Sequence, residues 1–138
     1  MKNLGELLAK SWLDKTFLNL DTLNAKDIPS TRKEAFEAQN FFYQSINKKT
    51  AGWKIGAVAK EVQEEEGYDG PVPGKIFEDT FLQINTNIDF NDIPHSNLEC
   101  EYALKFLKDS KIDNDLEKDL NQIKLFTAID ITSTRYEQ

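Results

Sequence analysis

The spacing of the apolar residues changes near residue 50, and this change limits the folds that the chain can adopt. Before residue 50, apolar side chains recur every three or four positions, for example at Leu4, Leu8 and Trp12, which predicts helices. After residue 50, apolar and polar residues alternate over several short segments, which predicts β-strands. Helices that come first and strands that come mostly later indicate an α+β fold.

Three helices are expected before residue 70. Asn3 can cap the first of them. Thr31 and Glu34 have the spacing of a capping box, which places the start of the second helix there. The third helix is short and polar, and Gly67 can end it.

Five segments are expected to form strands. They cover residues 50–57, 75–77, 80–84, 98–107 and 125–132. A further helix is expected at residues 113–124. The strand at residues 98–107 alternates most clearly, and its apolar residues, Cys100 among them, point to one face that we expect to belong to the core.

Composition argues against several classes of protein. The chain has 138 residues, of which 39% are hydrophobic, so it can form a real core. Its net charge of −7 argues against nucleic-acid binding, because phosphates require a basic face. Apolar runs are shorter than the roughly 18 residues of a membrane span, and the first ten residues lack a signal-peptide cleavage site. A single cysteine cannot form an internal disulfide, which fits a cytoplasmic protein.

Glu99 and Glu101 are separated by one residue on the clearest strand, so their side chains share a face with Cβ atoms about 7 Å apart. Two carboxylates at this distance repel by on the order of 2 kcal/mol at an effective dielectric near 20. A solvated edge strand tolerates this repulsion, whereas a buried face requires a cation. Hard divalent ions prefer oxygen ligands. The spacing therefore leaves a solvated face and a metal site as open alternatives.

Asp130 interrupts the apolar segment 128–131, where a solvent-facing acid is unexpected. A third carboxylate beside Glu99 and Glu101 would complete an all-oxygen site with positions left for water or substrate. A half-exposed strand explains Asp130 equally well.

Lys54 lies between Gly52 and Gly56 on the first expected strand. A partly desolvated lysine can bind a substrate carboxylate or assist proton transfer, and a solvent-facing strand lysine is the alternative. Asp79 lies between a turn and a strand, where an acid is usually a turn residue or a surface charge. His95 is the only histidine and is expected at the surface.

Four segments together resemble the 2-keto-4-pentenoate hydratases and the related 4-oxalocrotonate decarboxylases of the fumarylacetoacetate hydrolase superfamily. The segments are Gly52-Trp53-Lys54-Ile55-Gly56, the proline-glycine loop 71–79, Leu98-Glu99-Cys100-Glu101-Tyr102-Ala103-Leu104 and the segment 128–135. In this order they are similar to the G-W/Y-K-I-G signature, the loop with an acidic end, the E-x-E metal strand and the segment with the third metal ligand. The resemblance covers nearly the whole chain from Ser30 onward.

The resemblance implies a hydro-lyase of aromatic-compound catabolism that uses Mg²⁺ or Mn²⁺ and acts on a small 2-oxo or 2-hydroxy unsaturated carboxylic acid. The implied metal ligands are Glu99, Glu101 and Asp130. Lys54 is then expected to contact the substrate carboxylate or assist proton transfer, and Asp79 to orient water or act as general base. The resemblance also implies a homo-oligomer.

The chain departs from the family pattern in three ways, one of which is Thr134 at a position where Ser is more common. Asp130 stands where these hydratases usually have Glu, so its reach is one methylene shorter. The family continues for a similar length again, so the chain is expected to be an N-terminal half. We expect a helical region with one strand at residues 1–70 and the first part of a metal-binding β-roll at residues 71–138, within one incomplete domain. A decarboxylase or acylpyruvate hydrolase at the same site and a non-catalytic fragment are the alternatives.

Overall fold

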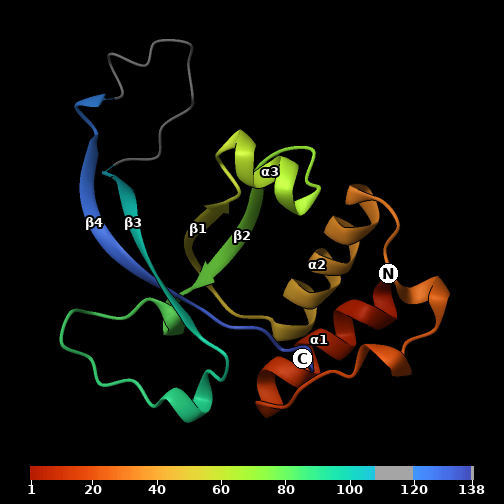
Figure 1. Cartoon of the computed structure of the whole chain (residues 1–138). Coiled ribbons are helices and arrows are strands. Elements are labelled where there is room, and N and C mark those ends of the chain that lie inside the picture. The colour runs from red at the N-terminus through yellow and green to blue at the C-terminus, as the bar shows by residue number, and fades with distance from the viewer. Residues whose placement is uncertain (108–119, 138) are drawn as a thin grey trace. The chain divides into compact units, whose positions relative to one another are not determined.

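The computed structural model describes residues 1–107 and 120–137, and its helices and antiparallel strands form an α+β fold, as predicted (Figure 1). The chain divides into two compact units. The first consists of Met1–Ile88 together with the C-terminal residues from Arg135, and the second consists of Asp89–Thr134. Short 3-10 helices occur at Leu20–Thr22, Ala25–Asp27, Glu78–Thr80 and Phe90–Asp92.

Helices α1 (Lys2–Asp14) and α2 (Arg32–Ile46) pack against each other in the first unit. The two helices approach each other closely at Gly5, because a Cβ atom on this residue would be 2.4 Å from the carbonyl oxygen of Ala38. A side chain of any size would therefore clash with backbone. Two buried clusters surround this contact: Leu4, Leu18 and Ala38, and Ala9, Ile46 and Phe77.

The predicted capping box is present at the start of α2. The Thr31 hydroxyl accepts a hydrogen bond from the Glu34 N–H at 3.2 Å, and the Glu34 carboxylate accepts one from the Thr31 N–H. Hydrogen bonds from the Ser30 side chain and backbone lower the pKa of Glu34. The predicted cap of α1 is wrong, because the helix begins before Asn3, whose side-chain amide instead donates to Asp27 at 2.9 Å.

Strands β1 (Thr50–Gly56) and β2 (Val72–Phe77) form an antiparallel pair, and helix α3 (Lys60–Glu66) lies in the connection between them. The expected strand at residues 50–57 is confirmed. The expected end of the third helix is also confirmed, since Gly67 follows α3 with a left-handed φ of 72°.

The predicted strand at residues 80–84 is wrong. Phe77 pairs with Thr50, the first residue of β1, so a longer β2 would have no further residue of β1 to bond. The chain instead turns into a 3-10 helix, in which the Thr80 hydroxyl donates to the Phe77 carbonyl at 3.0 Å.

The sheet of the second unit consists of β3 (Asn97–Phe106) and β4 (Ile123–Thr132), ten residues each in an antiparallel ladder. The predicted strands at residues 98–107 and 125–132 are confirmed. Residues 113–119 of the predicted helix lie outside the described residues. The end of that helix is wrong, because residues 123 and 124 belong to β4.

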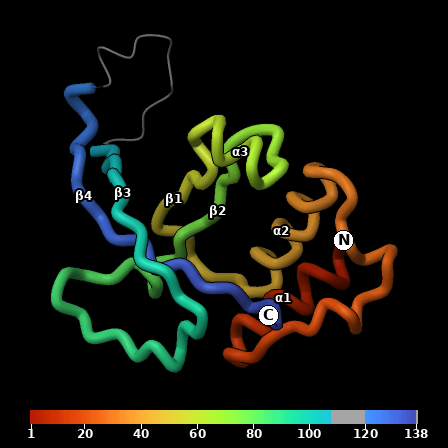
Figure 2. The backbone as a smooth tube through the Cα atoms, in the orientation of Figure 1, coloured from red at the N-terminus to blue at the C-terminus, as the bar shows by residue number. Residues whose placement is uncertain are grey.

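The C-terminal end of the chain returns to the first unit, beside the residues that follow α1 (Figure 2). The Leu18 N–H donates to the Arg135 carbonyl at 2.6 Å, and the Glu137 N–H donates to the Leu18 carbonyl at 3.2 Å. These bonds form a parallel bridge between Leu18 and Tyr136. Burial in this position raises the pKa of the Tyr136 hydroxyl.

Candidate functional site

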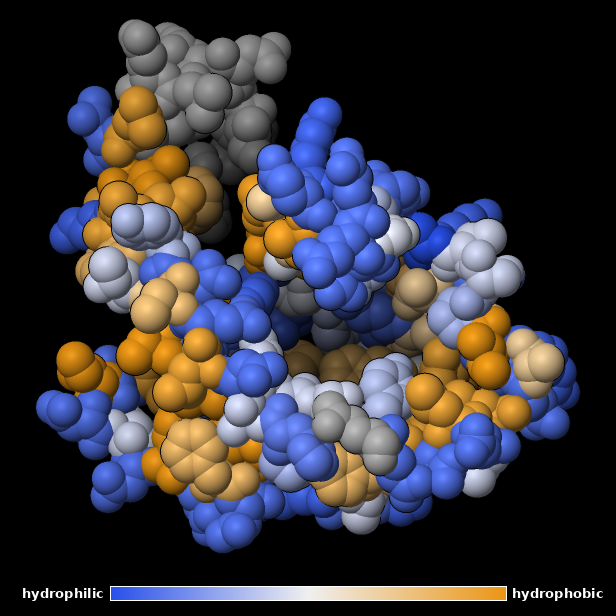
Figure 3. Space-filling view, viewed as in Figure 1, coloured by the Kyte–Doolittle hydropathy of each residue, from blue (hydrophilic) through white to orange (hydrophobic). Residues whose placement is uncertain are grey.

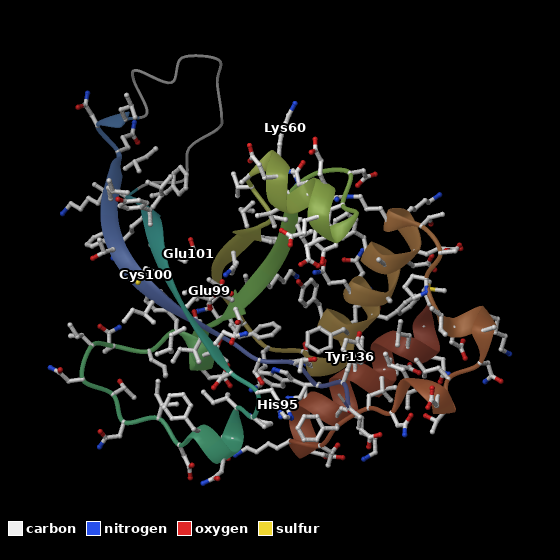
Figure 4. The ribbon with its side chains drawn as sticks, in the orientation of Figure 1. Lys60, His95, Glu99, Cys100, Glu101 and Tyr136 are labelled. Carbon is white, nitrogen blue, oxygen red and sulfur yellow. The ribbon has the colours of Figure 1, made fainter. Side chains whose placement is uncertain are left out.

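The register of the β3–β4 ladder brings the three predicted metal ligands to one face. Glu99 lies directly opposite Asp130, and Glu101 lies opposite Ala128. Residues directly opposite each other in an antiparallel pair point to the same side, as do residues two apart on one strand. Figure 4 shows Glu99 and Glu101 on one side of β3 and Cys100 on the other. We call the side with the three acids the carboxylate face.

The carboxylate face is partly covered, whereas the other side of β3 is exposed. Glu99, Glu101 and Asp130 are each half-buried. The Thr132 hydroxyl donates a hydrogen bond to Glu99 Oε1 at 3.3 Å. Thr132 follows Asp130 by two positions and so shares its face. Sequence reasoning missed this contact, because the period of two puts Thr132 on the face of Asp130 but only the register brings it near Glu99.

The donor set of this face fits a hard divalent cation, because three carboxylates supply only oxygen ligands. Cross-strand Cβ atoms are about 5 Å apart in such a ladder, and those two residues apart on a strand are about 7 Å apart. As the side chains lie, no group of three or more His, Cys, Asp or Glu residues within the described ranges could hold a metal ion. A common ion would therefore require these side chains to rotate toward one another.

Lys54 lies on the more covered face of β1. The residues of this strand alternate between half-buried and exposed, with Lys54 half-buried and Trp53 57% exposed. The residue opposite Lys54 on β2 is Gly74, which has no side chain, and a Cβ atom on Gly52 would meet nothing within 4 Å. The two glycines leave space beside the lysine stem. This placement favours a partly desolvated lysine over a solvent-facing one.

Asp79 forms an ion pair with Lys48, which follows α2. The Lys48 ammonium also lies over the Trp12 ring, 4.3 Å from its centroid. The adjacent pair, Lys49 and Glu78, has a separation of 2.6 Å. These contacts give Asp79 a structural role at the end of α2. Asp79 and Lys54 belong to the first unit, and the three acids of the ladder belong to the second.

The expectation that Cys100 lies in the core is wrong. Cys100 is exposed, as are its neighbours on the same face, Leu98 at 64% and Tyr102 at 78%. Alternation predicts which residues share a face, but it does not predict which face is covered. His95 is exposed, as expected from the polar sequence around it.

A scan against protein-family models finds no match for the chain, and a search of curated proteins finds no significant relative. Within the described part of the chain, no helix has the length and apolar character needed to cross a membrane. The family and the chemistry indicated by the sequence motifs therefore stay predictions.

Proposed function

We propose that this chain is part of a divalent-metal-dependent hydro-lyase similar to the 2-keto-4-pentenoate hydratases, in which β3 and β4 contribute to a β-roll of the fumarylacetoacetate hydrolase type. The substrate is a small 2-oxo or 2-hydroxy unsaturated carboxylic acid, and the reaction adds water across its carbon–carbon double bond. Glu99, Glu101 and Asp130 would hold Mg²⁺ or Mn²⁺. A bound ion of this kind supplies Lewis-acid polarisation of a substrate oxygen.

The observation that carries this proposal is the pairing of Glu99 with Asp130 in the ladder. The proposed site needs acids from two separate strands to reach one ion. A register shifted by one residue would turn Asp130 to the opposite face. The observed register supports the proposal because it puts the three acids on one face of the ladder, and the Thr132 hydroxyl donates a hydrogen bond to the Glu99 carboxylate there.

Two other residues have proposed roles toward the substrate. The Lys54 ammonium would bind the substrate carboxylate or transfer a proton, and its half-buried position between two glycines supports this role. Asp79 would orient water or accept a proton. Asp79 already forms an ion pair with Lys48 through Oδ2, so part of its carboxylate is engaged in a structural contact. Lys54 is therefore the stronger of the two candidates.

Metal binding tests the site directly. Glu101→Gln removes one charge and keeps the side-chain shape, so it is expected to weaken Mn²⁺ binding by about 10-fold or more, or ~1.4 kcal/mol, in titration calorimetry. The matched control is Glu64→Gln in the exposed acidic run of α3, which should leave Mn²⁺ affinity unchanged. Unchanged Mn²⁺ affinity in Glu101→Gln would reject the proposed ligand set.

Product analysis tests the reaction. Conversion of 2-hydroxypenta-2,4-dienoate to its water adduct in the presence of Mg²⁺ supports the hydratase. Release of CO₂ from 4-oxalocrotonate would instead identify a decarboxylase at the same site. Binding of Mn²⁺ without turnover of either compound would contradict the catalytic part of the proposal for this chain.

A further inference from the structure

Helix α2 bonds through polar side chains to the backbone of strand β2. The Gln39 amide donates a hydrogen bond to the Pro73 carbonyl at 3.0 Å, and the Lys75 N–H donates one to the Tyr43 hydroxyl at 2.9 Å. Gln39 and Tyr43 are four residues apart and so share one side of the helix. Pro73 and Lys75 are two residues apart on the strand, so their backbone groups lie on the same edge of β2. This is the edge that faces away from β1.

The outer edge of β2 would be weakly held without these bonds. A two-stranded sheet is marginally stable on its own, and an open edge leaves backbone groups unpaired. Pro71 and Pro73 have no N–H to donate, and Gly74 has no side chain to pack. The Arg32 guanidinium of α2 also donates to the Gly70 carbonyl at 3.0 Å, in the loop before β2. Helix α2 therefore occupies the position that a third strand would have beside β2.

The two bonds from α2 flank the residue that lies opposite Lys54. Gly74 pairs with Lys54 in the register of β1 and β2, and it lies between Pro73 and Lys75. A Cβ atom on Gly74 would be 3.8 Å from the Tyr43 hydroxyl oxygen, so this hydroxyl lies beside the same stretch of backbone. Within the described residues, β1 pairs with β2 alone. The position of Lys54 therefore depends on how firmly β2 is held.

We propose that Gln39 and Tyr43 are positioning residues for Lys54. They hold β2 beside α2, and β2 holds β1 through a register that pairs Gly74 with Lys54. Neither side chain touches the substrate, because each acts through the lysine. The catalytic consequence rests on the proposed function, whereas the structural link from the helix to Lys54 does not.

Limited acetylation of lysine amines, read by peptide mass spectrometry, tests this link without an assay of turnover. Tyr43→Phe removes the hydroxyl and keeps the ring that packs against Phe42 and Phe77. We expect Lys54 in this variant to react about 3- to 10-fold faster with N-hydroxysuccinimidyl acetate, which is the effect of losing one hydrogen bond of ordinary strength. The matched control is Tyr68→Phe, where Tyr68 is 47% exposed, and it should leave the Lys54 rate unchanged.

Two reference amines separate positioning from a general loosening of the fold. Lys60 is exposed on α3, where Figure 3 shows hydrophilic side chains gathered, and the Lys48 side chain is 30% exposed beyond the end of α2. Both should react at wild-type rates in Tyr43→Phe. Gln39→Met, which removes the amide donor and keeps an unbranched side chain, should give the same pattern. Equal acceleration of Lys48 and Lys54, or an unchanged Lys54 rate, would overturn the proposal.

A double-mutant cycle tests the catalytic consequence. If Tyr43 acts through Lys54, Tyr43→Phe should lower kcat/KM for water addition by about 3- to 10-fold in the wild type and change it little in Lys54→Ala. An equal loss in both backgrounds would identify a general structural role and overturn the positioning role. Faster labelling of Lys54 in Tyr43→Phe without turnover by the wild type would contradict the proposed function and support the link from α2 to Lys54.

Discussion

On strand β1, Lys54 lies on the opposite face from its two immediate neighbours. Trp53 and Ile55, although apolar, are 57% and 49% exposed, whereas the lysine between them is half-buried. A strand usually places the lysine outward and the apolar residues inward. The reversed arrangement is the physical reason to expect a function for this lysine.

Replacement of Lys54 tests that function. We expect Lys54→Ala to lower turnover by about 100-fold, the usual effect of losing a group that transfers a proton. The far-UV circular dichroism should stay unchanged, because the side chain packs beside glycines. Lys60→Ala, at the exposed start of α3, is the control and should keep wild-type kinetics. Wild-type kinetics in Lys54→Ala would remove this residue from the mechanism.

At the candidate site, sequence reasoning succeeded where the geometry is local. Glu99 and Glu101 share a face because side chains on any strand alternate with a period of two. The partner of Glu99 is set by the register between two segments, which depends on the connection between them and on the covered face. The motifs indicated that Asp130 joins the pair, but the register and the contact from Thr132 could be learned only from the structure.

At the scale of elements, the packing of α1 against α2 depends on one residue without a side chain. A Cβ atom on Gly5 would lie 2.4 Å from the Ala38 carbonyl oxygen and 2.6 Å from the Phe41 Cβ, so the helices would have to move apart. Gly5→Ala is therefore expected to lower the free energy of unfolding by about 3 kcal/mol, the upper range for overpacking.

Urea denaturation followed by tryptophan fluorescence measures this change, since Trp12 contacts Phe42 and Phe77 beside the same helices. Gly52→Ala is the matched control, because its added Cβ would meet no atom within 4 Å. We expect the control to shift the midpoint little. Equal destabilisation by the two substitutions would contradict the close approach at Gly5.

The distinction between local geometry and contacts of distant segments also explains which elements were predicted correctly. The capping box of α2 involves residues three positions apart, and the pattern alone identified it. Asn3 has the right residue type for a cap, but its amide bonds to Asp27, far along the chain, and the helix starts earlier. The segment 80–84 has strand-like residues, yet β1 offers no pairing positions beyond Thr50. In both segments, contacts with residues far along the chain determine the structure.

At the scale of the whole molecule, the two units differ in how they are stabilised. The first has buried clusters between helices and strands, including Ala9, Ile46 and Phe77. In the second, both strands have exposed apolar side chains. Six of them, on the side of the ladder opposite the carboxylate face, have exposed fractions of 54% or more: Leu98, Tyr102, Leu104, Phe106, Leu125 and Ile129. Two-stranded sheets are marginally stable without further packing. The stability of the second unit is therefore expected to rise more than that of the first when a ligand or partner binds it.

Hydrogen exchange read by mass spectrometry tests this difference. At low protein concentration, we expect amides of β3 and β4 to exchange faster than those of α1 and α2. Mn²⁺ at 100 times its Kd should stabilise the ladder by about 2.7 kcal/mol and slow its exchange by about 100-fold. Exchange in α1 and α2 should not change. At the same Mn²⁺ concentration, the roughly 10-fold weaker binding expected for Glu101→Gln should reduce the slowing in the ladder to about 10-fold. Equal slowing in both units, or none in the wild type, would contradict an ion held by the carboxylate face, because only β3 and β4 carry its ligands.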